Sequence, residues 1–221
     1  VYKRQVLSFP YIILLGLGGL GPAVAVISLT YLKEDKEVRY DYLRRVVDVK
    51  CINLKWLSII LLSAPVFCTL GIITGIVLNG EYPSLDTAFE LLVNPVGLIL
   101  YLFFIFIYGP LPEEVGWRGY VLDRLQKKWS ALYSSLILGI LWGIWHWPMF
   151  FMVGTYQSVQ QPLGSIRFFV DFWIAIIANT ILMTWVYNNT KRSTLSATLY
   201  HFIMNFTGLF LGLTSIQHIY K

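Results

Sequence analysis

The stretch PEEVGWRGY, residues 112–120, places two adjacent glutamates and an arginine in an otherwise apolar part of the chain. Glu114 and Arg118 are four residues apart, so on a helix they share a face and can form an ion pair. Glu113 points about 100° away around the helix axis and stays outside that pair. Because a carboxylate in a low-dielectric site can accept a proton from water, Glu113 is a candidate general base.

Two later apolar runs contain histidine. His146 follows Trp142 by one helical turn, so Trp142 can fix the imidazole ring, and His201 and Asn205 can lie side by side on another helix. Ionisable groups inside a bilayer are costly and usually mark a site. His146 could help Glu113 activate water, while His201 and Asn205 could donate hydrogen bonds to the oxyanion of a tetrahedral intermediate. The set predicts hydrolysis by activated water.

Other chemistries have less support in these residues. A zinc site of Glu113, His146 and His201 is possible by ligand type, but the sequence has no HExxH and no other metal-binding spacing. We therefore expect neither a metal nor an organic cofactor. No serine or cysteine has an identifiable partner for covalent catalysis. A further alternative is a hydrogen-bonded network of these polar groups that only locks the helices together.

The composition indicates the kind of element that must position these groups. Hydrophobic residues make up 57% of the 221-residue chain and charged residues 13%, and the mean hydropathy is +0.64, which indicates an integral membrane protein. Six apolar stretches are long enough to cross about 30 Å of hydrocarbon: Val6–Leu32, Trp56–Leu78, Pro95–Leu111, Trp129–Val153, Phe168–Tyr187 and Thr194–Ile216. We predict an all-α, multi-pass bundle of about six transmembrane helices, forming one domain over residues 1–221.

Basic residues set the expected orientation. Lys33–Lys55 contains seven lysines and arginines and Arg118–Lys128 four, whereas Asn79–Asn94 contains none. By the positive-inside rule, the basic loops face the cytoplasm and Asn79–Asn94 is external. The net charge of +5 is then explained by cytoplasmic loops beside membrane lipids, and no nucleic-acid partner is expected. Lys33–Lys55 mixes charged and apolar residues, which predicts a helix lying at the inner surface.

The depth of the polar groups depends on where the third span ends. If Gly109–Lys128 continues that span as a helix kinked at Pro110 and Pro112, Glu113 lies about 21 Å from the cytoplasmic boundary at 1.5 Å per residue. The same rise puts His146, His201 and Asn205 about 14–24 Å from that boundary. Gly116 and Gly119 would let a neighbouring helix come close. We therefore expect one site in the cell membrane, accessible from the cytoplasmic side.

Three segments together are similar to a known family. The order and spacing of EEVGWR (Glu113–Arg118), WGIWH (Trp142–His146) and HFIMN (His201–Asn205) resemble the EExxxR, FxxxH and HxxxN motifs of the CPBP family, which includes CAAX prenyl endopeptidases and bacteriocin-processing or immunity proteins. The resemblance covers about residues 109–212. It differs at Trp142, where the family commonly has phenylalanine.

The resemblance implies a glutamate-dependent intramembrane protease. By position, Glu113 and His146 would activate water, His201 and Asn205 would form the oxyanion site, and Glu114, Arg118 and Trp142 would support them.

We expect a metal-independent endopeptidase that cuts near the C-terminus of a lipidated or membrane-tethered protein or peptide. The alternative is a non-catalytic membrane partner, such as a bacteriocin self-immunity protein. A proton-coupled transporter that uses Glu113 and the histidines as a relay is the third hypothesis. The sequence sets no expectation for the oligomeric state.

Overall fold

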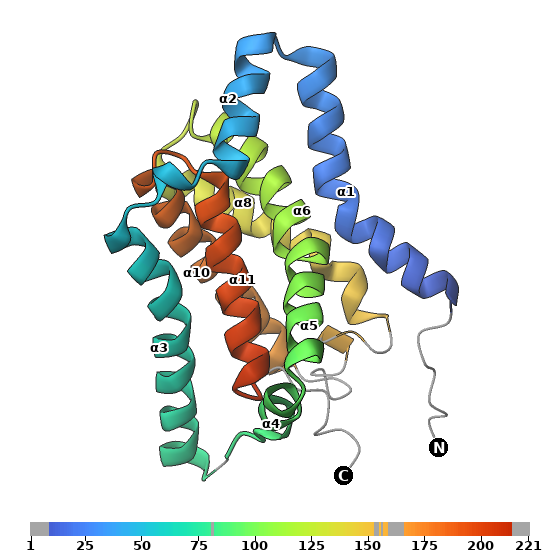
Figure 1. The fold of residues 1–221 in the computed structure, drawn as a ribbon, viewed down its shortest axis with the longest axis vertical. Coiled ribbons are helices and arrows are strands. Elements are labelled where there is room, and N and C mark those ends of the chain that lie inside the picture. The colour runs from blue at the N-terminus through green and yellow to red at the C-terminus, as the bar shows by residue number, and fades with distance from the viewer. Residues whose placement is uncertain (1–8, 81, 153–154, 156, 159–165, 214–221) are drawn as a thin grey trace.

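The computed structural model describes residues 9–80, 82–152, 155, 157–158 and 166–213, and every regular element within them is helical (Figure 1). The predicted all-α class is confirmed. The principal α-helices are α1 (Phe9–Lys33), α2 (Lys36–Val47), α3 (Leu54–Asn79), α4 (Asp86–Val93), α5 (Pro95–Tyr108), α6 (Pro110–Gly116), α7 (Asp123–Leu125), α8 (Ala131–His146), α10 (Ile166–Asn189) and α11 (Thr194–Phe210). Three shorter segments are the 3₁₀ helices η1 (Val49–Cys51) and η3 (Trp147–Phe150) and the π-helix η2 (Trp117–Leu122).

Each of the six apolar stretches forms a helix over most of its described length. Within the part of the chain that the structure describes, four helical stretches are long and apolar enough to cross a membrane: Gly16–Lys33, Leu54–Leu78, Pro95–Leu125 and Phe168–Asn189. The other two, α8 and α11, have 16 and 17 residues and so fall short of a typical bilayer crossing. Residues 6–8 and 214–216 of the expected spans, and most of the loop expected at 154–167, lie outside the described residues.

The third span is one long helical path with a break at Gly109, as the two prolines predicted. It runs from Pro95 to Leu125 through α5, α6, η2 and α7. Gly109 leaves the helical conformation, with φ −121° and ψ −96°, and Pro110 and Pro112 begin the next helix. The kink is confirmed. The π-helical turn that follows Gly116 was not predicted, because no simple sequence pattern distinguishes it from an α-helix.

The segment expected as an external loop, Asn79–Asn94, contains the short helix α4. This corrects the sequence prediction, which treated the segment only as a connection between spans. The helix buries Ala88 (6% exposed) and contacts α5 and α11. Eight residues are too few to give a reliable periodic signal, and α4 depends on these contacts rather than on its own propensity.

Helix α2 occupies much of the segment predicted to be helical between residues 33 and 55, and it is tied to the bundle by buried polar contacts. The Tyr42 hydroxyl donates to the carbonyl oxygen of Val115 over 3.2 Å. Burial raises the pKa of Tyr42, so the phenol stays a donor. Arg45, 4% exposed, donates to Asp41 (2.9 Å) and to the Tyr187 hydroxyl (2.6 Å). These bonds connect α2 to α6 and α10.

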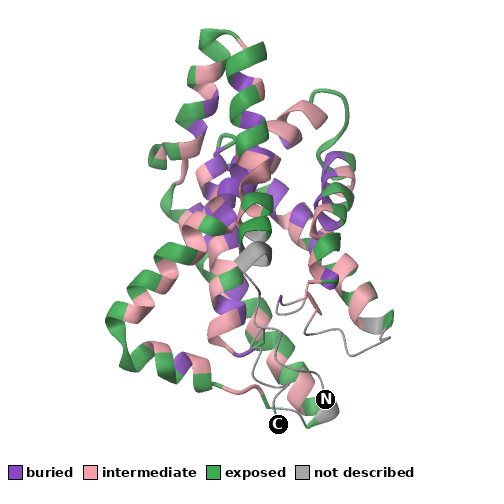
Figure 2. Cartoon of the chain, turned by 90° about the vertical axis from the view of Figure 1, so that its right-hand side faces the viewer, coloured by how far each residue is buried: buried purple, intermediate pink, exposed green. Residues whose placement is uncertain are grey.

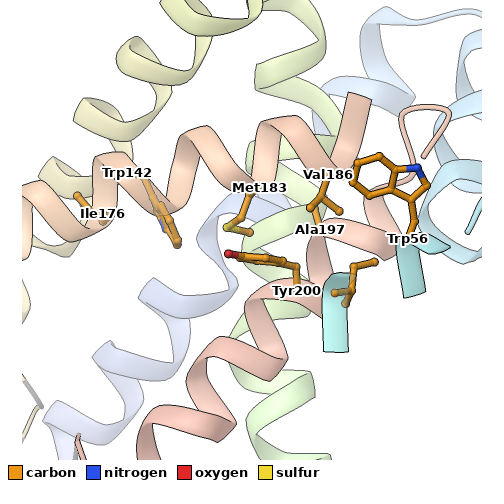
Figure 3. Close-up of a cluster of buried hydrophobic side chains, with 8 residues drawn as sticks. Trp56, Trp142, Ile176, Met183, Val186, Ala197 and Tyr200 are labelled. Carbon is orange, nitrogen blue, oxygen red and sulfur yellow. The ribbon is translucent and has the colours of Figure 1, made fainter. Parts of the chain in front are cut away.

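The bundle is organised by four pairs of neighbours: α8 packs on α10, α1 on α6, and α11 on both α3 and α6. Buried residues gather where the helices meet, and exposed residues cover much of their outer faces (Figure 2). The largest apolar cluster contains Trp56, Ile60, Trp142, Ile176, Met183, Val186, Ala197 and Tyr200. Trp142 and Trp56 lie toward opposite ends of this cluster (Figure 3).

Two glycines bring neighbouring chain segments against the helix that bears the glutamates, as the sequence predicted. A Cβ added at Gly116 would lie 2.5 Å from Pro22 Cβ and 2.9 Å from the Pro22 carbonyl oxygen. A Cβ at Gly119 would lie 3.1 Å from the Tyr42 ring and 3.3 Å from the Thr194 hydroxyl. Gly116 therefore sets the closest approach of α1 to the helix carrying Glu113.

We predict that Gly116→Ala destabilises the protein and lowers its melting temperature in detergent by several degrees. Alanine favours a helix over glycine by about 1 kcal/mol. The clash with Pro22 involves backbone atoms that cannot rotate away, and overpacking of this kind costs about 1–3 kcal/mol, so the clash should prevail.

Gly71→Ala is the matched control, since it is also a mid-helix glycine and nothing lies within 4 Å of its added Cβ. It should keep or raise the melting temperature. Equal melting temperatures for the two variants would contradict close packing of α1 on α6.

Candidate active site

The two adjacent glutamates of α6 have different partners. Glu114 and Arg118 are both 0% exposed, and Arg118 Nη1 donates to Glu114 Oε1 over 2.9 Å, which is the ion pair expected from their spacing. Arg118 Nη2 also reaches the Thr180 hydroxyl at 3.5 Å. Glu113, 8% exposed, forms no ion pair with any described residue. The pair therefore leaves Glu113 as the carboxylate without a bound cation.

The ion pair extends to α11 through His201. Its Nδ1 lies 2.9 Å from Glu114 Oε1, the same oxygen that accepts from Arg118. Glu114 Oε1 accepts from Arg118, and as the shared acceptor of both bonds it accepts the hydrogen that His201 Nδ1 carries. The sequence placed these residues at similar depth but did not predict this bond, because helix spacing gives no information on partners from different helices.

Trp142 of α8 connects the remaining polar groups. Its indole Nε1 donates to Glu113 Oε2 over 2.8 Å. The Arg118 guanidinium carbon lies 4.4 Å from the centre of its ring, and the His146 and His201 rings meet it edge-on at 5.5 and 5.2 Å between centroids. The sequence assigned Trp142 only to His146. Most buried indole N–H groups have an acceptor, which was the available signal for the bond to Glu113.

His146 is held in one tautomer by its own helix. Its Nδ1 lies 2.8 Å from the backbone carbonyl oxygen of Trp142, which can only accept, so Nδ1 carries the hydrogen. In the neutral ring Nε2 is then free to accept a proton. Trp145 and Phe172 contact the ring edge-on at 4.8 and 5.8 Å between centroids. Trp142 therefore orients His146 through its main chain as well as its ring.

Two pairs of candidate residues share no hydrogen bond among the described residues. In the described part of the chain no hydrogen bond or ion pair joins Glu113 to His146, and Trp142 contacts both. Asn205 follows His201 by one turn of α11 and is exposed, without a hydrogen bond to the other candidate residues among those described. Glu113, Glu114, Arg118, Trp142, His146 and His201 thus form one connected cluster, and Asn205 lies at its margin.

The carboxylate and imidazole groups of the site can be compared with what a metal ion requires of its ligands. Among the described residues, no three histidine, cysteine or carboxylate side chains are grouped so that they could hold a metal ion. Glu113 Oε2, His146 Nδ1 and His201 Nδ1 are each engaged by a protein partner. A buried carboxylate beside an imidazole with a free Nε2 can instead remove a proton from water.

We predict that Glu114→Ala lowers both the yield of folded protein and its melting temperature. The substitution leaves Arg118 as an unpaired buried charge and removes the acceptor of His201. Breaking such a pair typically costs about 3–5 kcal/mol.

The double variant Glu114→Ala with Arg118→Met should recover part of that loss, because methionine keeps most of the volume and no charge is stranded. Thermal melting and size-exclusion profiles of the single and double variants measure the difference. A double variant less stable than Glu114→Ala would show that charge stranding is not the main cost.

Comparison with known proteins gives two matches. A family model described as type II CAAX prenyl endopeptidase Rce1-like matches residues 95–207, just over half of the chain. A protein of Methanococcus maripaludis named CAAX prenyl protease 2 is 28% identical over 206 residues, which cover 92% of this chain and 74% of that protein. The family match includes Glu113, His146 and His201, together with the helices that carry them.

Proposed function

This chain belongs to the Rce1-like type II CAAX prenyl endopeptidase family, and from that premise we propose that it is an intramembrane glutamic endopeptidase. Members of this family are membrane proteases, and this chain has the same type of activity. Its substrate would be a lipidated or membrane-tethered protein cut near the C-terminus. The support is the similarity to the Methanococcus maripaludis protein named CAAX prenyl protease 2.

The observation that carries the proposal is that the two adjacent glutamates have different bonding partners. Glu114 is committed to Arg118 and His201, whereas Glu113 is buried, forms no ion pair with any residue that the structure describes, and has one carboxylate oxygen engaged by Trp142. A structural carboxylate at this depth would be expected to have a cationic partner, because an unpaired buried charge is costly. Glu113 therefore fits a general base better than a stabilising residue.

The proposed reaction uses one water molecule, and no covalent bond forms between the enzyme and the substrate. Glu113 takes a proton as the water oxygen attacks the carbonyl carbon of the scissile peptide bond, while His146 Nε2 accepts a hydrogen bond from the same water. The tetrahedral intermediate then collapses with cleavage of the C–N bond. Glu113 returns its proton to the leaving amine, so the acid and base are restored at the end of each cycle.

The proposed oxyanion site places a condition on His201. Because Nδ1 donates to Glu114, a neutral His201 has no hydrogen on Nε2 and cannot donate to an oxyanion. The ring must therefore act as an imidazolium, with the Glu114 carboxylate as a counter-ion shared with Arg118. Asn205, exposed one turn further along α11, would supply the second donor through its amide.

The site would be entered from the cytoplasmic side. The support is the distribution of basic residues, which are concentrated in Lys33–Lys55 and Arg118–Lys128. Helix α2, with its mixed charged and apolar residues, forms a hairpin with α1 (Figure 1), and this hairpin would lie at the cytoplasmic side.

We predict that Glu113→Gln lowers peptide hydrolysis by roughly 100-fold or more, the usual scale for loss of a general base, while the protein still folds. Glutamine keeps the size of the side chain and an oxygen that can accept from Trp142. Cleavage of a farnesylated peptide by the purified protein in detergent, with the melting temperature measured in parallel, tests this.

An unprenylated peptide of the same sequence is the substrate control. Wild-type protein that binds but does not cut either peptide would favour a non-catalytic membrane partner. Full activity in Glu113→Gln, combined with a well-folded but inert Glu114→Gln, would mean that the roles of the two glutamates are reversed.

We also predict that chelators leave cleavage largely unchanged. The proposed base and its imidazole partner require no metal, and the described residues contain no group of three His, Cys, Asp or Glu side chains that could hold one. The measurement is the hydrolysis rate before and after dialysis against a strong chelator. Activity that disappears and returns with zinc would make Glu113, His146 and His201 metal ligands.

A further inference from the structure

The indole N–H of Trp142 donates a hydrogen bond to Glu113, and the indole ring packs on the largest hydrophobic cluster on one side and on Arg118, His146 and His201 on others. Trp142 is 5% exposed and belongs to the largest hydrophobic cluster, beside Ile176 (Figure 3). Its Nε1 nevertheless lies 2.8 Å from Glu113 Oε2. It is the one hydrogen bond that the Glu113 side chain makes within the described part of the chain.

Core packing accounts for the ring of Trp142 but not for the direction of its N–H. Trp117, the first residue of η2, is a useful comparison. Its indole Nε1 is buried too, but it has no hydrogen-bond partner among the described residues. Both indoles lie close to the same cluster, yet only that of Trp142 is aimed at a carboxylate. Packing alone thus does not require the bond.

The bond has a chemical consequence for a carboxylate that must accept a proton from water. The two oxygens of a free carboxylate are equivalent, and the group can rotate between positions. A donor on Oε2 stops this rotation and leaves Oε1 as the oxygen that can accept. Positioning of a base relative to its substrate is a recognised source of rate enhancement.

We propose that Trp142 is a positioning residue for hydrolysis, whose indole N–H holds Glu113 Oε2 so that Oε1 acts as the base. This inference rests on the proposed function of Glu113. The same residue holds His146 through its backbone carbonyl, so Trp142 sets the relative placement of the two groups that face the attacking water.

Trp142→Phe isolates the indole donor. Phenylalanine keeps an aromatic face for Arg118, which lies 4.4 Å from the Trp142 ring, and it keeps the carbonyl that binds His146. We expect kcat to fall by about tenfold, the value of one hydrogen bond to a charged group, with KM changed less than about twofold. Trp117→Phe removes an indole N–H without a partner and should leave both constants unchanged.

A double-mutant cycle separates positioning of Glu113 from a structural effect. If Trp142 acts through Glu113, Trp142→Phe should have no further effect on the residual single-turnover rate in the Glu113→Gln background. A tenfold loss in both backgrounds would overturn the inference, since Trp142 would then act independently of the base. So would an unchanged kcat in Trp142→Phe.

If Trp142→Phe folds poorly, replacement of Trp142 by benzothienylalanine provides a second test of the indole N–H. This analogue has sulfur in place of the N–H and almost the same shape, so the expected result is the same tenfold loss in kcat with an unchanged melting temperature. Full activity of this variant would exclude the positioning role. The proposed function fails separately: it fails if Glu113→Gln is active, whatever Trp142 does.

Discussion

A carboxylate and a guanidinium that are both fully buried must neutralise each other, because neither can be hydrated. Glu114 and Arg118 satisfy this constraint at the centre of the bundle. The Glu114 oxygen that accepts from Arg118 also accepts from His201, so the last helix is fixed to the third span by the same charge. The pair thereby supports the whole cluster, and the neighbouring Glu113 forms no ion pair within the described part of the chain.

Close packing makes this burial possible. Gly116 lets Pro22 of α1 approach α6, and Gly119 lets Tyr42 of α2 and Thr194 of α11 approach η2. Helices α1, α2 and α11 therefore all contact the two helical turns that contain Glu113, Glu114 and Arg118. Larger side chains at these glycines would separate the helices and admit lipid or water beside the charges.

Much of this arrangement was readable from the sequence, and the reasons for the omissions are physical. Hydropathy gave the apolar helices, the prolines gave the break near Gly109, and i, i+4 spacing gave the Glu114–Arg118 pair. Each of these is a local property of the chain. The bonds from Trp142 to Glu113 and from His201 to Glu114 join different helices, and their partners depend on rotation and depth that no local pattern specifies. Helix α4 was missed for a related reason, since it depends on its contacts with α5 and α11, and the π-helical turn was missed because its sequence does not differ in pattern from an α-helix.

The packing of α1 and α2 on α6 also bears on what a working fragment must contain. The family match begins at residue 95, after both of these helices. Yet α1 covers α6 at Gly116, and α2 donates a hydrogen bond to the carbonyl of Val115, two residues after Glu113. A fragment trimmed to the matched residues would retain every candidate catalytic side chain. It would lose α1 and α2, which pack against α6 and shield these side chains from water. For expression or design, the useful boundary is the one set by packing, well upstream of the recognisable motifs.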